Sequence, residues 1–388
     1  MKKSIVSMAA MAAMLLMSCS STKNIDTAYE IGVSQETVNA MVAERDAKSA
    51  GSLDIPDSDG VDEEGYDDMS QTDVSRGESI TDAEGHYLFN PFVKSDTLAE
   101  IYPQEYWDAM FNLVDALRNG RDTFECGSAD AFSFAKDPSV WSEFFPVACI
   151  LYDDTNGDVF SYEDGVGKIN YPMSVEDFLE KEKAFEEDIE GILRESVKAE
   201  YNDYEKALFL YDYVTGNFAY DNGMVGNFNE EDEELYDLGH KYGTYYCFKN
   251  RSGICSGIAA AYVYLLHQCG VDAFTISNEG GSHRWVYLKI DGVGYYSDPT
   301  WGIRSDDVTE MFLDYFLFSN QRRSDDYPID TYRAHIPESR GDACDFSMFS
   351  ADDERYDYLR YTSLQDINTD ENIVTYTNGK GQTLDYQY

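Results

Sequence analysis

The chain has 388 residues, of which 43% are hydrophobic and 14% aromatic, and it carries a formal net charge of −45. This composition is apolar enough for a folded core, so the chain as a whole is not intrinsically disordered. The acidic balance excludes nucleic-acid binding by phosphate neutralisation and disfavours adhesion to anionic lipid head groups, because both need clustered cations.

The N-terminus has the pattern of an export signal. A short basic start precedes the apolar stretch 5–17, which is too short to span a bilayer and has the length of a signal-peptide core. The segment Leu16-Met17-Ser18-Cys19 resembles the lipobox of bacterial lipoproteins, which implies a signal peptide at 1–18 and lipid on Cys19. The alternative is an ordinary cleaved signal with an incidental cysteine. We expect an exported protein, held at a bacterial membrane by lipid, on the cell surface or in the periplasm.

Residues 19–85 are acidic, dotted with Gly and Ser, and poor in apolar side chains. Such a segment cannot bury enough surface to offset its ordering entropy, so we predict a disordered tether.

The region 86–195 is predicted to be an α+β extension. Apolar residues at helical spacing predict helices over 103–118 and 174–194. Between them, the apolar run 144–152, the turn pair Asn156-Gly157 and the segment 159–162 predict a β-hairpin.

The stretch 253–270 is the most informative part of the chain. Its apolar residues from Ser256 onward predict a helix closed by Gly270, which places Cys255 at the helix N-terminus. There, unpaired N–H groups and the helix dipole favour a thiolate over a thiol. A lone cysteine at such a place is most often a buried hydrophobe, so any chemistry depends on partners from elsewhere.

Two predicted strands offer those partners. The pair Asp291-Gly292 is a hairpin signal between them, and a two-residue turn there would make Ile290 face Val293. In that register His283 is the diagonal neighbour of Asp298. A thiolate, an imidazole and a carboxylate would then form a nucleophile, a base and an orienting group.

Three motifs occur in an order that resembles the transglutaminase-like superfamily. They are Gly-Ile-Cys-Ser-Gly-Ile-Ala at 253–259, His-Arg-Trp-Val at 283–286 and Tyr-Tyr-Ser-Asp-Pro-Thr-Trp at 295–301. The resemblance covers about residues 200–303. It implies an α+β, papain-like core at 196–320, in which a helix bearing Cys255 packs on an antiparallel sheet bearing His283 and Asp298 as the other two catalytic residues.

Members of this superfamily include protein cross-linkers, peptidases, amidases and inactive scaffolds. The resemblance therefore implies thiol-dependent acyl transfer or hydrolysis on peptide, protein or cell-wall amides, without a cofactor. The alternative is a catalytically inactive domain that binds a protein or peptide. A third hypothesis is an assembly protein whose acidic N-terminal and flanking regions carry its function.

The remaining candidate residues carry weaker signals. Trp285 and Trp301 are candidate substrate contacts, although packing beside the site is the commoner role, and Tyr245 and Tyr246 are candidate substrate contacts or oxyanion donors. No metal site is expected, because His86, His240 and His335 have no His or Cys at ligand spacing. Disulfide pairing among the other cysteines stays open. Residues 321–388 are polar, with a predicted strand at 373–376, and are interpreted as a C-terminal appendage.

Overall fold

The computed structural model describes residues 76–151, 159–222, 243–278, 281–304, 310–323 and 331–388. Arg76–Tyr388 form one compact unit. This unit begins before the predicted start at residue 86, because β1 (Ile80–Thr81) pairs antiparallel with β2 (Tyr87–Leu88). The predicted signal peptide, Cys19, the rest of the tether and Asn156-Gly157 lie outside the described residues.

The two long helices predicted for the N-terminal region are confirmed as α5 (Gln104–Arg118) and α8 (Val175–Ser196). α8 begins where the Ser174 side chain accepts the backbone N–H of Asp177. The elements between and before them are α4 (Asp96–Ala99), β3 (Thr123–Glu125), α6 (Ala129–Ala135), α7 (Pro138–Phe144), the 3-10 helix η2 (Pro146–Leu151), β4 (Phe160–Glu163) and β5 (Val166–Ile169).

The predicted hairpin across 144–162 is wrong. Its first half ends α7 and forms η2, all of whose residues are buried, so a continuous apolar run here marks a helical segment buried on all sides. The real hairpin joins β4 to β5 through Asp164 and Gly165, both of which have positive φ, as a tight two-residue turn requires.

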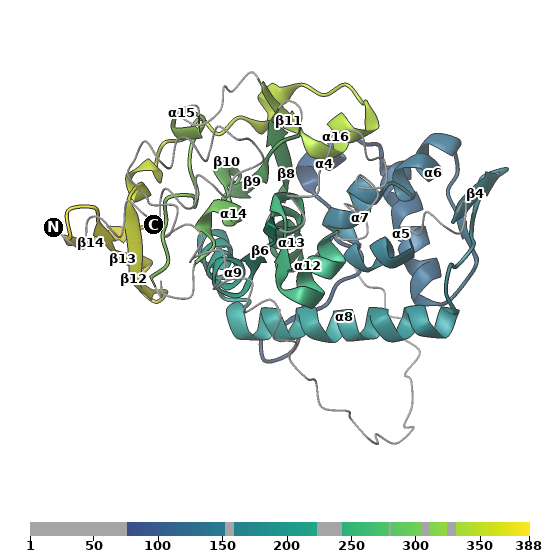
Figure 1. Ribbon diagram of the computed structural model, residues 1–388, viewed down its shortest axis with the longest axis horizontal. Helices are drawn as coiled ribbons and strands as arrows, with labels where there is room; N and C mark the ends of the chain where they lie inside the picture. The colour runs from purple at the N-terminus through teal and green to yellow at the C-terminus, as the bar shows by residue number, and fades with distance from the viewer. Residues whose placement is uncertain (1–75, 152–158, 223–242, 279–280, 305–309, 324–330) are drawn as a thin grey trace. The chain divides into compact units, whose positions relative to one another are not determined.

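α13 (Cys255–Gln268) lies at the centre of the unit (Figure 1). It packs against β8 (Ala273–Asn278) and β9 (Arg284–Ile290) and is also contacted by α7, α9 (Asp203–Asn217) and α12 (Thr244–Asn250). All of its residues except Ser256 are buried, which explains why its sequence is apolar on every face. The helix predicted after Cys255 is thereby confirmed.

The central sheet has four antiparallel strands in the order β10-β9-β8-β11. They are β8 (Ala273–Asn278), β9 (Arg284–Ile290), β10 (Val293–Ser297) and β11 (Tyr332–Ala334). The predicted register is confirmed, because Val293 pairs with Ile290 and both Asp291 and Gly292 adopt positive φ. A short parallel pair, β6 (Ala219–Tyr220) and β7 (Ser252–Gly253), leads into α13.

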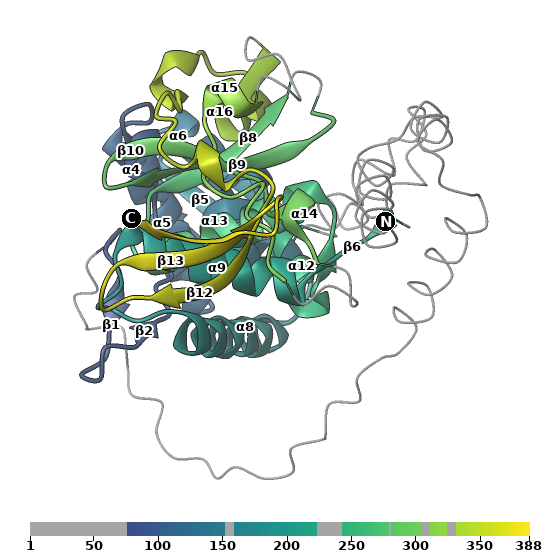
Figure 2. The same ribbon diagram turned by 90° about the vertical axis from the view of Figure 1, so that its left-hand side faces the viewer.

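The C-terminal region continues the same unit. It contains α14 (Pro299–Gly302), α15 (Asn320–Arg323), α16 (His335–Arg340), the 3-10 helices η4 (Phe346–Phe349) and η5 (Asp357–Leu359), and a three-stranded sheet of β12 (Thr362–Asn368), β13 (Ile373–Asn378) and β14 (Thr383–Gln387). The strand predicted at 373–376 is the middle one. This sheet lies against α9 (Figure 2). The ring of Tyr204 in α9 stacks there on the ring of Tyr388, with centroids 4.2 Å apart.

Within the described ranges, no helix is both long and apolar enough to cross a membrane. In the same ranges, no group of three or more His, Cys, Asp or Glu side chains is placed to hold a metal ion.

Replacing Asn202 with alanine should lower the free energy of unfolding by about 1 kcal/mol. The Asn202 side chain accepts the backbone N–H of Glu205 at 3.0 Å and so caps α9, which alanine cannot do. Urea denaturation of the two proteins measures the difference. Asn202→Asp is the matched control, since a carboxylate caps equally well, and an alanine variant as stable as the wild type would contradict the prediction.

Candidate active site

Cys255 is the first residue of α13, which begins after Ile254 without any side-chain cap. The backbone N–H groups of the first turn have no partner within the helix, so they face outward with the positive end of the helix dipole. The preceding strand is held in place because the Asp221 N–H donates to the Gly253 carbonyl at 2.9 Å. Cys255 keeps 8% of its surface exposed.

His283 lies immediately before β9 and is almost completely buried. Its backbone N–H donates to Oδ1 of Asn278 at 2.9 Å, which ties it to the end of the neighbouring strand β8. Its imidazole Nε2 lies 2.6 Å from Oδ2 of Asp298 and its side chain also exchanges a hydrogen bond with Cys255. With Nε2 held by the carboxylate, Nδ1 is the nitrogen left for the thiol.

Asp298 follows β10 and is fully buried. It caps α14, because its Oδ1 accepts the Trp301 N–H at 3.3 Å, while Pro299 occupies the first helical position. Its other oxygen faces His283. The sequence therefore uses one side chain both to start a short helix and to hold an imidazole.

The charges of this pair stabilise one another. Burial opposes the protonated imidazole of His283, but Asp298 and Cys255 outweigh it and raise the pKa of His283 to about 9. Burial alone would raise the pKa of Asp298, yet His283 and Arg323 hold that pKa below its ordinary value. The pair is thus an imidazolium beside a carboxylate near neutral pH.

Arg323 is a site residue that sequence reasoning missed. It comes from α15, is fully buried, and places Nη2 at 3.2 Å from Oδ2 of Asp298. The local sequence Asn-Gln-Arg-Arg is polar and resembles a solvated surface segment. The pairing of Tyr296 with Phe318 brings this segment alongside β10, and this long-range contact has no local signal in the sequence.

The predicted substrate contacts occupy different depths. Trp285 has no exposed surface, so it supports the site from within and does not meet a substrate. Trp301 is half-buried and stacks on His283 with ring centroids 5.0 Å apart. Tyr245 is buried against Phe185 of α8, with Tyr246 against its edge. The structure therefore brings Cys255, His283, Asp298 and the two tryptophans together, whereas Tyr245 belongs to the core.

Residues 190–298 match the family model described as the transglutaminase-like superfamily. The matched segment runs from the end of α8 to Asp298 and includes Cys255 and His283. The resemblance seen in the motifs is confirmed for this part of the chain, and the mixed fold with antiparallel sheets agrees with it. No curated protein matches the chain.

The stability that His283 contributes should disappear in the alkaline range. A histidine whose pKa rises on folding stabilises the protein fully below its unfolded pKa of about 6.5, and this contribution is lost as pH rises through about 9. The difference in unfolding free energy between wild type and His283→Gln should therefore shrink by on the order of 3 kcal/mol across this interval. Urea denaturation of both proteins in buffers spanning the interval measures it. A difference that stays constant with pH would contradict the prediction.

Proposed function

We propose that the transglutaminase-like domain of this chain is a thiol enzyme acting on peptide or amide bonds. In this proposal Cys255 is the nucleophile, His283 the general base and acid, and Asp298 the group that orients the imidazole. The observation that carries the proposal is the buried His283–Asp298 pair, 2.6 Å apart, beside a cysteine at a helix N-terminus. This is the geometry that nucleophilic catalysis by a thiol requires.

The reaction would proceed in two steps. The Cys255 thiolate attacks the carbonyl carbon of an amide, and His283 gives its proton to the departing nitrogen as the C–N bond breaks, leaving a thioester. Water then attacks the thioester while His283 takes its proton, which releases an acid and restores the thiolate of Cys255 beside the imidazolium of His283. If an amine attacks instead, the product is a new amide, which is cross-linking.

The helix terminus that holds Cys255 also offers a place for the developing oxyanion. The N–H groups of the first turn of α13, which begins at Cys255, have no acceptor within the helix. Donors fixed in this way stabilise the tetrahedral intermediate without reorganising during the reaction.

A catalytically inactive binding module is the alternative. A fully buried Asp298 speaks for the enzyme, because a buried charge costs several kcal/mol of solvation and has to be compensated by nearby cations. A binding surface has no use for such a group, whereas a catalytic imidazole needs it.

We further propose that the protein works outside the cytoplasm, anchored by lipid on Cys19 after removal of residues 1–18. The lipobox-like segment Leu16-Met17-Ser18-Cys19 supports this placement. A protein at the surface or in the periplasm meets peptides, proteins and cell-wall amides, and these are the substrate classes that we propose.

An alkylating reagent should label Cys255 selectively at neutral pH. Among the other described cysteines all are buried except the half-buried Cys344, whose pKa is raised by burial. Mass mapping after brief iodoacetamide treatment should find the label on Cys255 in the wild type and in Cys344→Ser. A wild-type protein that resists labelling at Cys255 would favour the binding module.

Replacing Cys19 with alanine should move the protein from the membrane fraction to the soluble exported fraction. The wild-type protein should yield an N-terminal peptide that begins at Cys19 and carries the mass of attached lipid. Several acyl chains hold a protein stably at a membrane, whereas one chain does so only marginally. Because the alanine variant would carry no chain, it should leave the membrane fraction completely. Equal partitioning of the two proteins would refute the lipid anchor while leaving the proposed chemistry untouched.

A further inference from the structure

Arg323 occupies an unusual place for a charged side chain. It is fully buried, and its Nη2 lies 3.2 Å from the same Asp298 oxygen that His283 Nε2 approaches to 2.6 Å. A single carboxylate oxygen therefore carries two cationic partners. Arg323 lies beyond the segment 190–298 that matches the superfamily, so the match itself says nothing about it.

Two tryptophans fix the plane of this guanidinium. Its Cζ lies 4.3 Å from the ring centroid of Trp285 and 4.7 Å from that of Trp301. Cation–π contacts of this kind favour a planar guanidinium over the compact ammonium of lysine. Trp301 also stacks on His283, so the guanidinium of Arg323, the ring of Trp301 and the imidazole of His283 form one packed array.

We propose that Arg323 is a positioning residue for the reaction assigned to Cys255, acting through Asp298. It fixes the rotamer of Asp298 that faces His283. Its positive charge also influences how strongly Asp298, His283 and Cys255 each hold a proton. This inference rests on the proposed function and adds to the reaction a residue from outside the matched segment.

The direction of the effect follows from electrostatics. A buried positive charge favours the deprotonated form of every titratable neighbour. Within the described residues, the titratable groups around this array include Cys255 from α13, His283 before β9, Asp298 after β10, Tyr296 from β10 and Tyr211 from α9. Arg323 keeps Asp298 ionised, and it also limits the hold of Asp298 on the imidazolium, so that His283 can release its proton and act as a base in the second step.

The test is the pH dependence of the rate at which iodoacetamide alkylates Cys255 in the full chain. Arg323→Gln should move the pH midpoints of the alkylation profile, which report the titration of Cys255 and His283, to higher pH by about one unit. The reason is that loss of the positive charge favours protonation of Cys255, His283 and Asp298. Arg323→Lys should keep the midpoints near their wild-type positions, because it keeps the charge. A glutamine variant with the wild-type profile would overturn the proposal.

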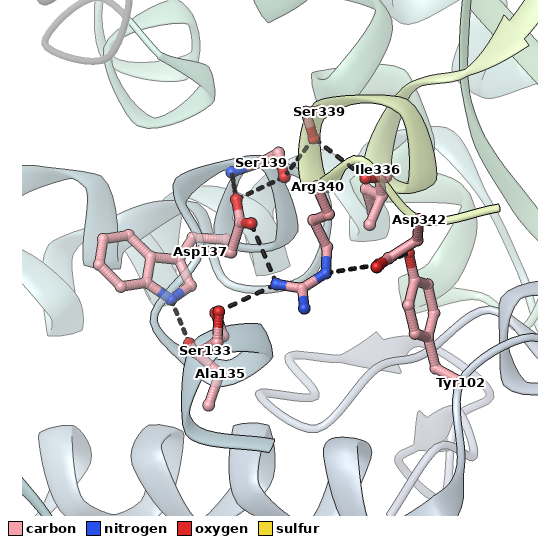
Figure 3. A network of polar contacts seen from close by, with 10 residues as sticks. Tyr102, Ser133, Ala135, Asp137, Ser139, Ile336, Ser339, Arg340 and Asp342 are labelled. Atoms are coloured by element: carbon pink, nitrogen blue, oxygen red, sulfur yellow. Dashed lines mark hydrogen bonds and ion pairs between the residues drawn. The ribbon is translucent and has the colours of Figure 1, made fainter. Parts of the chain in front are cut away.

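Arg340 supplies a matched control, shown in Figure 3. It is largely buried, pairs with Asp137 at 3.2 Å and Asp342 at 3.0 Å, and lies over the ring of Phe134. None of these partners belongs to the candidate site. Arg340→Gln should lower thermal stability and leave the alkylation profile unchanged, and if Arg323→Gln does no more than that, its role is structural only.

Two further measurements keep the outcome decisive. If wild-type Cys255 is not alkylated at all, the proposed function fails, and NMR titration of the His283 imidazole still tests Arg323, with a higher titration midpoint expected in Arg323→Gln.

If Arg323→Gln does not fold, Arg323→Lys carries the test. Its plateau rate should fall about tenfold, because an ammonium cannot be held flat between Trp285 and Trp301 as the guanidinium is, so Asp298 loses its alignment. An unchanged plateau would overturn the positioning role.

Discussion

The candidate site depends on one carboxylate that has no contact with solvent. Burying an ionised Asp298 costs several kcal/mol unless cations replace the lost water. The fold supplies two of them, His283 and Arg323, on the same oxygen, and a backbone N–H of α14 on the other. Each part of the compensation comes from a different segment, so the site forms only when the end of β10, the start of β9 and α15 have come together.

Because Asp298 depends on Arg323, the candidate site includes residues beyond the three sequence motifs that contain Cys255, His283 and Asp298. Arg323 is delivered by the segment that pairs Phe318 with Tyr296, and β11 then returns to complete the edge of the sheet beside β8. The C-terminal sheet is in turn fastened to α9, where the Tyr388 hydroxyl donates to Oε1 of Glu205 at 2.6 Å. A region with the composition of a polar tail therefore supports the same core that carries Cys255.

The sequence predicted those parts of the site that local rules determine. The register of the β9–β10 hairpin follows from Asp291-Gly292, whose positive φ values select a two-residue turn, and that register places His283 beside Asp298. The position of Cys255 follows from the apolar stretch of α13 that comes after it and from Gly270, which closes the helix.

Other features were set by tertiary packing, which local patterns do not encode. The described part of the apolar run, 144–151, forms the end of α7 and then η2, because helices can be buried on all sides as readily as strands. Arg323 has no periodic or turn signal around it, and a buried arginine is recognisable only once Trp285, Trp301 and Asp298 surround it. The compensation of the Asp298 charge by Arg323 exists only in the assembled fold, so local sequence patterns cannot predict it.

The four groups are arranged by depth, and this order explains how they work as a unit. Cys255 retains 8% exposure and His283 1%, whereas Asp298 and Arg323 retain none. In the proposed reaction Cys255 is the one group of these four that meets the substrate, and the charges behind it lie where solvent screens them weakly, so each acts strongly on the next. A change in the deepest group is then felt at the thiol, although no atom of Arg323 needs to approach the reacting carbonyl. In this way a row of buried ion pairs sets the reactivity of the Cys255 thiol.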